Sequence, residues 1–516
     1  MSIRPGHTYA MGYRIGEVPV KVPECDLEMD GLVELVGRGL RYKRRVMFRA
    51  FEKMRIPGYV PISADINDPN TLLAGYRARL LRNNPKRDEE YMRKLPLFTE
   101  KLVEFMFKGR KVKKMTFKQW LETTSYSLGR KKQLEVVEEK NKGCLPPKRK
   151  CQKVKGFGKT ECNGKYKTPR NIMSRVDEVK VIFGPLFKAI ELVVYESKYF
   201  VKHLTPEQKM ERVRNMVCGT GFYCFESDYS GWESVFDPEM MKACEFILYK
   251  SMLSDKDFKM VETVLAGKNR ISGRGYKVTC QGKRCSGEMN TSLGNGFSNL
   301  CLTLFLIWMK IGEPEDVSVV FDHYDGIVEG DDQLAVTDVE LSAADFEKVG
   351  ITIKMQRRPR PCEASFCGMV FTSTGEIVRE PRRFLEKFCW TGSFLAADEH
   401  MMDCLLRAKA LSTLFETPQC PIVAPLAHRA LELTRGVTPR FVYDGYHEKV
   451  SDEFKVVDYN PSHEVRVLFA SLYGISVSAQ IKAEQAIMKS DFATLSEIIP
   501  PSRDFSTYEA RYVLKL

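Results

Sequence analysis

Two adjacent aspartates stand at a short glycine turn between two runs of strand-forming residues. The turn is Glu329-Gly330-Asp331-Asp332, and the runs cover residues 317–328 and 333–337. Glycine allows the positive backbone angle of a tight hairpin turn, which β-branched residues disfavour. Paired carboxylates are hard oxygen ligands of the kind that Mg²⁺ and Mn²⁺ prefer, and such ions act on phosphates. The segment therefore predicts a β-hairpin with a metal site at its tip; an exposed acidic turn is the alternative.

A third carboxylate is expected at the end of an upstream strand. Residues 221–227 are rich in aromatic residues and lead directly into Asp228. Asp237-Pro238 then combines an N-cap residue with a first-turn proline, which predicts a helix start. Two-metal phosphoryl transfer needs carboxylates from separate elements around ions about 3.5–4 Å apart. Asp228 and Asp331 are the predicted pair.

A loop of small residues follows and leads into an apolar helix. It contains Ser286 and Gly287, and the helix begins near Thr291. Thr291 and Asn295 are one helical turn apart, so their hydroxyl and amide share a face on which both can hydrogen-bond a ribose. Glycine lets the backbone approach a ligand closely. A glycine-rich helix start without a binding role is the alternative.

In this order the three segments resemble the palm of viral RNA-dependent RNA polymerases, most closely the tombusvirus-like and nodavirus-like group of positive-strand RNA viruses. Residues 228–233 are similar to the first palm motif, residues 286–295 to the second and residues 330–332 to the third. Weaker matches are residues 350–354, similar to the fourth motif, and residues 364–368, similar to the turn before the thumb. The resemblance covers roughly residues 120–390. It implies an α+β right-hand fold with an antiparallel palm sheet and mostly helical fingers and thumb.

The resemblance also implies a role for each matched residue. Asp228 and Asp331, with Asp332 assisting, would hold two Mg²⁺ (or Mn²⁺) ions, and Lys354 would protonate the leaving pyrophosphate. The first motif usually carries a second aspartate that helps to select ribose, and Glu233 stands in its place here. Glutamate is one methylene longer, so the geometry must differ. The nucleotide-contacting residues implied besides the metal ligands are Glu233, Ser286, Gly287, Thr291 and Asn295.

Positive charge is concentrated in one part of the chain. The sequence has 80 Lys+Arg and 67 Asp+Glu, and residues 101–170 alone carry 21 basic and 6 acidic residues. This block predicts a phosphate-facing surface, with a solvated face as the alternative. Residues 164–175 resemble the finger motif that covers the incoming triphosphate, which implies Lys167, Arg170 and Arg175 as its cations. Arginine suits this task because its planar fork binds phosphate oxygens bidentately. Thr168 departs from the family, which more often has a lysine before the proline.

Three regions are expected within one continuous body. Residues 1–215 would form an N-terminal extension and fingers, residues 216–378 the palm, and residues 379–516 the thumb and a C-terminal tail. Residues 140–159, rich in Lys, Gly and Pro, are expected to be linker-like. The implied function is RNA-directed RNA polymerisation, with template RNA, nascent RNA and ribonucleoside triphosphates as partners.

Localisation is inferred from cysteine and hydrophobic content. Fifteen cysteines without a secretory signal predict reduced thiols in a cytosolic setting, and the resemblance to viral polymerases implies that this is the cytoplasm of a host. The longest apolar segment, residues 300–311, contains a lysine and is shorter than the ~20 residues that span a bilayer. We therefore expect no membrane span and, if relatives' membrane association applies, anchoring through a viral replication protein.

Two other functions stay open at this point. A reverse transcriptase also has paired aspartates in a palm hairpin, although the Ser-Gly, Thr and Asn segment suits ribose contacts. A non-catalytic basic RNA-binding replication or capsid protein would explain residues 101–170 but would leave the carboxylates without a task. Incorporation of ribonucleotides or deoxyribonucleotides, or of neither, distinguishes the three.

Overall fold

The computed structural model describes the backbone of three N-terminal strands and most of the chain from Phe48 onwards. The strands are β1 (Gly6–Ala10), β2 (Tyr13–Val18) and β3 (Gly31–Leu35). The other described residues are 48–59, 64, 66–161, 167–216, 219–442, 450 and 454–501.

Four strands form an antiparallel sheet with the order β10-β11-β7-β12. Its strands are β7 (Tyr223–Tyr229), β10 (Tyr324–Glu329), β11 (Asp332–Thr337) and β12 (Ile353–Arg358). Helix α12 (Thr291–Lys310) precedes β10, and α13 (Ala343–Glu347) precedes β12. Apart from an insertion between β7 and α12, this is a β-α-β-β-α-β arrangement in which β11 separates the parallel strands β7 and β10.

Alternate residues of β7, β10 and β11 face two different cores. Phe225, Val328 and Ala335 belong to the larger core, which α12 dominates. Cys224 and Leu334, one position away on their strands, pack in a second core with α7 (Pro206–Arg214). That second core also contains the short strands β13 (Ser365–Phe366), β14 (Met369–Phe371) and β15 (Ile377–Val378), which η3 (Pro361–Glu363) precedes. The sheet is therefore covered on both faces.

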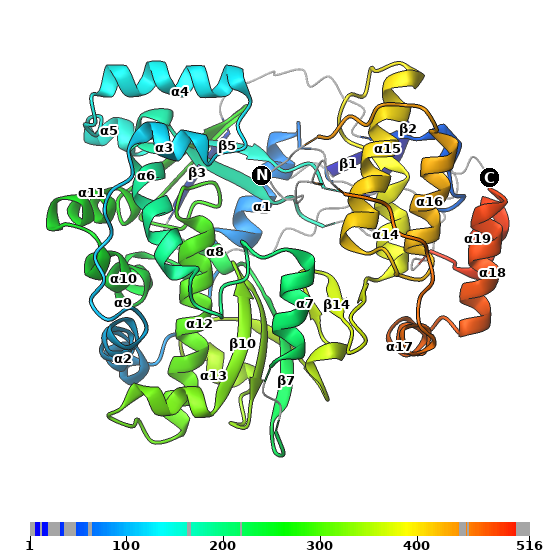
Figure 1. Ribbon diagram of the computed structural model, residues 1–516. Coiled ribbons are helices and arrows are strands. Elements are labelled where there is room, and N and C mark those ends of the chain that lie inside the picture. Colours follow the sequence, from blue (N-terminus) through cyan, green and yellow to red (C-terminus); the bar gives the residue numbers. More distant parts are fainter. Residues whose placement is uncertain are drawn as a thin grey trace.

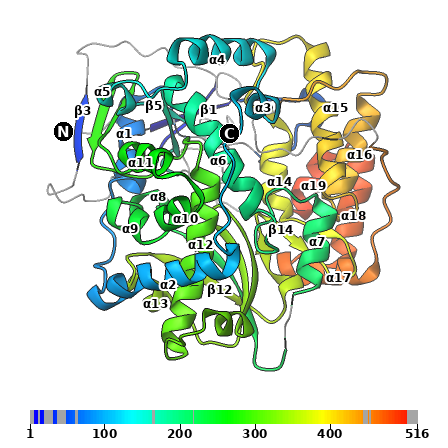
Figure 2. The same cartoon turned by 60° about the vertical axis from the view of Figure 1, so that its left-hand side comes forward.

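Helices from before and after β7 complete the larger core. Phe98 of α2 (Glu89–Phe107) packs against Phe305 and Trp308 of α12, and Figure 2 shows α2 crossing near α12. The other contributing helices are α3 (Phe117–Glu122), α4 (Leu128–Asn141), α6 (Asp177–Val194), α8 (Trp232–Val235), α9 (Pro238–Ala243), α10 (Glu245–Met252) and α11 (Asp255–Leu265). The predicted start of α9 is confirmed, because the Asp237 side chain accepts a hydrogen bond from the Met240 amide and Pro238 is the first helical residue.

A five-stranded sheet with the order β3-β9-β8-β5-β6 forms a separate layer. Its remaining strands are β5 (Lys153–Gly158), β6 (Asn171–Arg175), β8 (Asn269–Gly273) and β9 (Tyr276–Cys280). Helix α1 (Pro69–Arg79) packs on it through Leu72 and Tyr76. The prediction of a linker at 140–159 is wrong, because α5 (Lys148–Cys151) and β5 lie there. In β5, exposed residues alternate with buried ones, so its lysines belong to the outer face of a strand.

The C-terminal helices form a third body, drawn in yellow to red in Figure 1. They are α14 (Pro381–Phe388), α15 (Glu399–Glu416), α16 (Val423–Leu433), α17 (His463–Tyr473), α18 (Val477–Met488) and α19 (Phe492–Ile498). Residues 48–59 pack into the same core, although they were expected with the fingers. This segment contains β4 (Arg49–Ala50), which pairs with β16 (Trp390–Thr391), and η1 (Glu52–Met54). The N-terminal region therefore does not form one unit, because residues 48–59 belong to the C-terminal core and α2 belongs to the larger core.

One segment after α12 differs from its predicted structure, and α12 itself is unusually apolar. Residues 317–322, expected to be part of a strand, form the 3-10 helix η2 (Val317–Asp322), because Asp316 caps it and Val317 and Val320 are buried at helical spacing. Helix α12 is long and apolar enough to cross a membrane by length and composition alone. However, 89% of its most apolar 18-residue window is buried inside the protein, as in a core helix; no other described helix meets that test.

Candidate active site

The predicted acidic hairpin is confirmed, and its turn is the two residues Gly330 and Asp331. Glu329 and Asp332 are the last pair of the β10–β11 ladder. Gly330 has a φ of 64°, in the left-handed region that glycine adopts without a steric penalty. A side chain at this position would meet open space, so the backbone angle alone requires glycine. The turn leaves Asp331 and Asp332 exposed at the sheet edge.

Strand pairing brings Asp228 to the same edge. The β11–β7 ladder ends at Gln333 opposite Ser227, so the next residues, Asp332 and Asp228, are neighbours. On the other side of β7, Lys354 of β12 lies directly opposite Asp228. The structure therefore brings together four of the predicted catalytic residues, three carboxylates and one lysine.

The three aspartates form a concentrated negative charge. Asp331 and Asp332 reach solvent, but the protein around them removes much of their hydration, which raises the pKa of both carboxyls. For Asp332 the pKa rises from 3.8 to about 6, and the charges of Asp331, Glu329 and Asp228 add to the effect. Repulsion of this kind is relieved by a proton or by a cation.

The donor set fits a hard divalent cation. Three carboxylates that repel one another supply the oxygen ligands and the negative charge that Mg²⁺ requires. In the described part of the chain, no group of three or more His, Cys, Asp or Glu side chains is already arranged around a single point as metal ligands. Asp228, Asp331 and Asp332 are the residues that would hold the ion.

A buried asparagine, which the sequence reasoning did not identify, links the two acidic segments. Asn299 of α12 accepts a hydrogen bond from the Tyr229 hydroxyl (2.8 Å) and donates to the carbonyl oxygens of Gly330 (3.2 Å) and Asp332 (3.4 Å). It lies one helical turn beyond Asn295, so the spacing of polar residues along the helix was a usable signal. One side chain thus connects the end of β7 to the hairpin turn.

The loop before α12 is docked on β6. The Ser286 hydroxyl donates to the Asn171 carbonyl (2.9 Å), and the Gly287 amide donates to the Met173 carbonyl (2.9 Å). A Cβ atom at Gly287 would lie 2.8 Å from that carbonyl oxygen, which explains why the position has no side chain. The loop therefore needs glycine for a close backbone approach, although here the approach is to protein.

Thr291 and Asn295 differ in their availability to a ligand. The Thr291 hydroxyl donates to the Cys285 carbonyl (3.0 Å) and accepts from the Glu288 amide (3.1 Å), so its only donor is used within the loop. Asn295 is buried, and its amide oxygen has no hydrogen-bond partner. Of the two, Asn295 retains an acceptor that a ribose hydroxyl could satisfy.

The three predicted triphosphate-binding cations lie in different environments. Lys167 and Arg170 are exposed, and Arg170 pairs with Glu161 while its charge helps to offset that of Asp331. Arg175 is buried, is ion-paired with the equally buried Glu288 and donates to the Cys151 carbonyl (3.0 Å). The structure brings Arg170 to the carboxylates, whereas it places Arg175 inside the protein.

Glu233 lies in the first turn of α8, just after a tight bend. Gly231, with a φ of 64°, forms the bend. Desolvation raises the pKa of the Glu233 carboxyl, and the negative charge of Asp331 adds to the rise, so the two groups are electrostatic neighbours. Arg79 and Arg170 act in the opposite direction. Arg79 comes from α1, about 150 positions earlier, and no local pattern points to it.

Two further contacts support the hairpin. Lys209 of α7 is ion-paired with Glu329 (3.1 Å). The Cys367 thiol donates to Asp332 (3.4 Å) from the β13–β14 turn. Desolvation and the Asp332 charge raise the pKa of Cys367, so it remains a protonated donor. The family resemblance in the sequence predicted a turn at residues 364–368, but it did not predict this contact.

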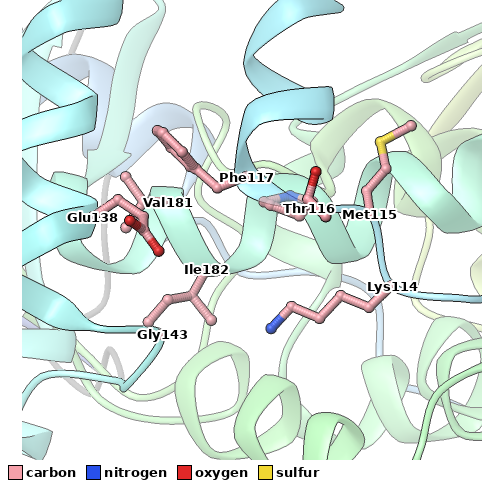
Figure 3. Close-up of a pocket in the computed structure, with 9 residues that line it drawn as sticks. Lys114, Met115, Thr116, Phe117, Glu138, Gly143, Val181 and Ile182 are labelled. Atoms are coloured by element: carbon pink, nitrogen blue, oxygen red, sulfur yellow. The ribbon is translucent and has the colours of Figure 1, made fainter.

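A cavity of about 300 Å³ lies elsewhere, between α3, α4 and α6. Figure 3 shows its charged residues, Lys114 and Glu138, on opposite sides, with Ile182 between them. None of its lining residues comes from the four-stranded sheet or α12. It is separate from the carboxylate site.

Comparison with known proteins bears on this site directly. Residues 206–387 match the family model for viral RNA-dependent RNA polymerase. No curated protein matches the chain. The matched segment begins at α7 and ends in α14, so it contains the four-stranded sheet, the loop before α12 and all three aspartates. The match supports a viral RNA-dependent RNA polymerase, which is a nucleotidyltransferase.

Proposed function

We propose that this chain replicates a viral RNA genome by adding ribonucleotides to an RNA 3′-hydroxyl, in the manner of the tombusvirus-like and nodavirus-like polymerases. The observation that carries the proposal is the meeting of Asp228 with Asp331 and Asp332 at one sheet edge, within the segment that matches the polymerase family. Carboxylates from two separate elements are what metal-assisted phosphoryl transfer needs.

Asp228, Asp331 and Asp332 are the proposed metal ligands. When bound, two Mg²⁺ ions would supply Lewis-acid stabilisation of the charge on the reacting phosphate. The protein's own contribution is to hold the three carboxylates through strand pairing and the Asn299 hydrogen bonds. Lys354, opposite Asp228, is the proposed proton donor to pyrophosphate.

Nucleotide binding is assigned to a smaller set of side chains than the sequence predicted. Asn295 offers its unpaired amide oxygen to a ribose hydroxyl, with Glu233 beside Asp331 as the second sugar-facing group. Arg170 and Lys167 would receive the triphosphate. Arg175, Ser286, Gly287 and Thr291 support the shape of the site through their contacts with the protein.

The fold supports a division into fingers, palm and thumb. The palm would be the β-α-β-β-α-β unit within residues 216–378, and the thumb the C-terminal helices together with residues 48–59. Template and nascent RNA would be the partners. Replication in the host cytoplasm, with membrane attachment through a viral replication protein, completes the proposal.

The test is primer extension with purified protein, template RNA, Mg²⁺ and four ribonucleotides. Wild-type protein should form a complementary strand, whereas Asp331→Ala and Asp228→Ala should form none. Asp338→Ala is the matched control, because Asp338 follows the opposite end of β11 and pairs with His323. Equal synthesis by all variants would reject the proposal, and preferential use of deoxyribonucleotides would indicate a reverse transcriptase instead.

A further inference from the structure

The end of α1 rests on the bend that leads from Asp228 to Glu233. Arg82 donates to the Ser230 carbonyl (2.9 Å). A Cβ atom at Gly231 would lie 2.6 Å from Arg82 Cδ and 3.1 Å from the Arg79 carbonyl oxygen. A segment about 150 residues upstream therefore sets the position of this bend.

The Arg79 side chain lies within electrostatic range of the acidic groups of the site. It is half-buried, and its Nε atom is buried without a hydrogen-bond partner. The charges within its electrostatic range are Glu233, Arg170, Glu161 and Asp331, of which Glu233 has the largest effect. No oxygen of a described acidic residue lies close enough to Arg79 to form an ion pair.

A charged Glu233 carboxylate is unfavourable at this position unless a cation lies near it. Its carboxylate is poorly hydrated and faces the charge of Asp331. Its extra methylene also gives it more rotamers to choose from. Arg170 is already ion-paired with Glu161. Arg79 is the other nearby cation that opposes the Glu233 charge.

We propose that Arg79 is a positioning residue that holds Glu233 toward the ribose of the incoming nucleotide, so that discrimination against deoxyribonucleotides depends on α1. This inference rests on the proposed polymerase function. Arg79 acts through Glu233, and its guanidinium orients the carboxylate rather than binding the nucleotide.

The experiment is single-nucleotide incorporation on a primed RNA template, with kcat/KM measured for each ribonucleotide and its deoxy counterpart. Arg79→Ala should lower kcat/KM for the ribonucleotide about tenfold and leave the deoxyribonucleotide value nearly unchanged, so the discrimination ratio falls about tenfold. Glu233→Ala should lower the discrimination ratio by the same factor. The double variant should have a discrimination ratio no lower than that of either single variant. Arg79→Lys, which keeps the charge, should recover part of the ratio.

Arg77→Ala is the matched control, because Arg77 is on the same helix but is not among the charges acting on Glu233. The thermal unfolding midpoint of each variant checks that α1 remains folded. Equal losses for both sugars, or additive effects of Arg79→Ala and Glu233→Ala, would mean that Arg79 contacts phosphate directly and would overturn the inference. Absence of synthesis by the wild-type protein would instead overturn the polymerase function itself.

Discussion

At the scale of single residues, Gly330 shows how a backbone angle can matter without any contact. Its φ of 64° is costly for other residues, yet a side chain there would touch nothing. We expect Gly330→Ala to cost roughly 1–2 kcal/mol of stability and to lower primer extension strongly, because relaxation of the turn displaces Asp331. Gly474→Ala is the control: Gly474 ends α17 with a φ of 68° and equally open surroundings. It should lose similar stability but keep activity; equal activity loss in both variants would contradict this role of the turn.

The Asp332 carboxyl gives a second residue-scale prediction, about pH and metal. Its folded-state pKa of about 6 lies above the ordinary 3.8, so the metal-free folded protein binds this proton more tightly than the unfolded chain. This group's contribution to stability therefore falls as the pH rises from 3.8 to about 6. Mg²⁺ should raise the unfolding temperature more at pH 7 than at pH 5, where protons compete for the carboxylate, and EDTA should reverse the effect.

Asp332→Asn separates this effect from nonspecific salt effects. The variant should be more stable than wild type at pH 7 without Mg²⁺, because one of the repelling charges is gone. Its response to Mg²⁺ should be smaller. Thermal unfolding with and without Mg²⁺ at both pH values measures this, and an undiminished Mg²⁺ response in the variant would show that Asp332 does not take part in binding.

Arg170 and Arg175 were both predicted to bind the triphosphate, but their substitution should have different effects on stability and on KM. Arg175→Ala leaves Glu288 buried without its partner, so we expect a loss of about 3–5 kcal/mol in the free energy of unfolding. Arg170→Ala removes an exposed group and should change stability by less than about 1 kcal/mol, while raising KM for ribonucleotides. Denaturant unfolding and steady-state kinetics test the pair. A higher KM for Arg175→Ala with normal stability would restore its predicted role in triphosphate binding.

At the scale of elements, α12 acts as the connector between the acidic segments. Asn299 and, one turn further on, Thr303 both bond to the sheet, Thr303 through the Gln333 side chain (3.0 Å). Asn299→Leu would leave the Gly330 and Asp332 carbonyls without their donor. We expect a loss of about 1–3 kcal/mol in stability and at least a tenfold lower kcat, measured by primer extension. Thr303→Val should cost similar stability with little change in kcat, and matching activity losses in both would show that the helix has only a packing role.

Local sequence patterns predicted the turn and the strand that carry the aspartates. Contacts between residues far apart in the sequence determine which other side chains reach the site. The glycine turn is confirmed by the positive φ of Gly330, and the predicted strand before Asp228 is present as β7, which continues one residue further to Tyr229. The linker prediction at 140–159 is wrong. It relied on the high content of Lys, Gly and Pro, whereas exposed and buried residues alternate in β5, and pairing with β6 and β8 stabilises this strand. Arg79 and the Cys367 thiol reach the site only through the fold, so their sequence positions carried no signal.

At the scale of the whole molecule, residues 48–59 connect the chain's beginning to its C-terminal helices. The Tyr59 hydroxyl donates to the Ile499 carbonyl (2.7 Å), and the Trp390 indole donates to the Tyr59 carbonyl (3.0 Å). These contacts are buried and span more than 300 positions. A division of the sequence into consecutive regions could not predict them, since they depend on the chain returning to the same core.

The C-terminal core should therefore lose stability as a unit when this connection is weakened. Tyr59→Phe keeps the ring but leaves the Ile499 carbonyl without its donor, at a cost of about 1–3 kcal/mol. Hydrogen–deuterium exchange should become faster in α14–α19 and stay unchanged in α12, because the two belong to separate cores. Tyr91→Phe, in α2 of the other core, is the matched control and should leave α14–α19 protected. Faster exchange throughout the protein after Tyr59→Phe would instead show that the cores unfold together, so that residues 48–59 stabilise the active-site sheet as well.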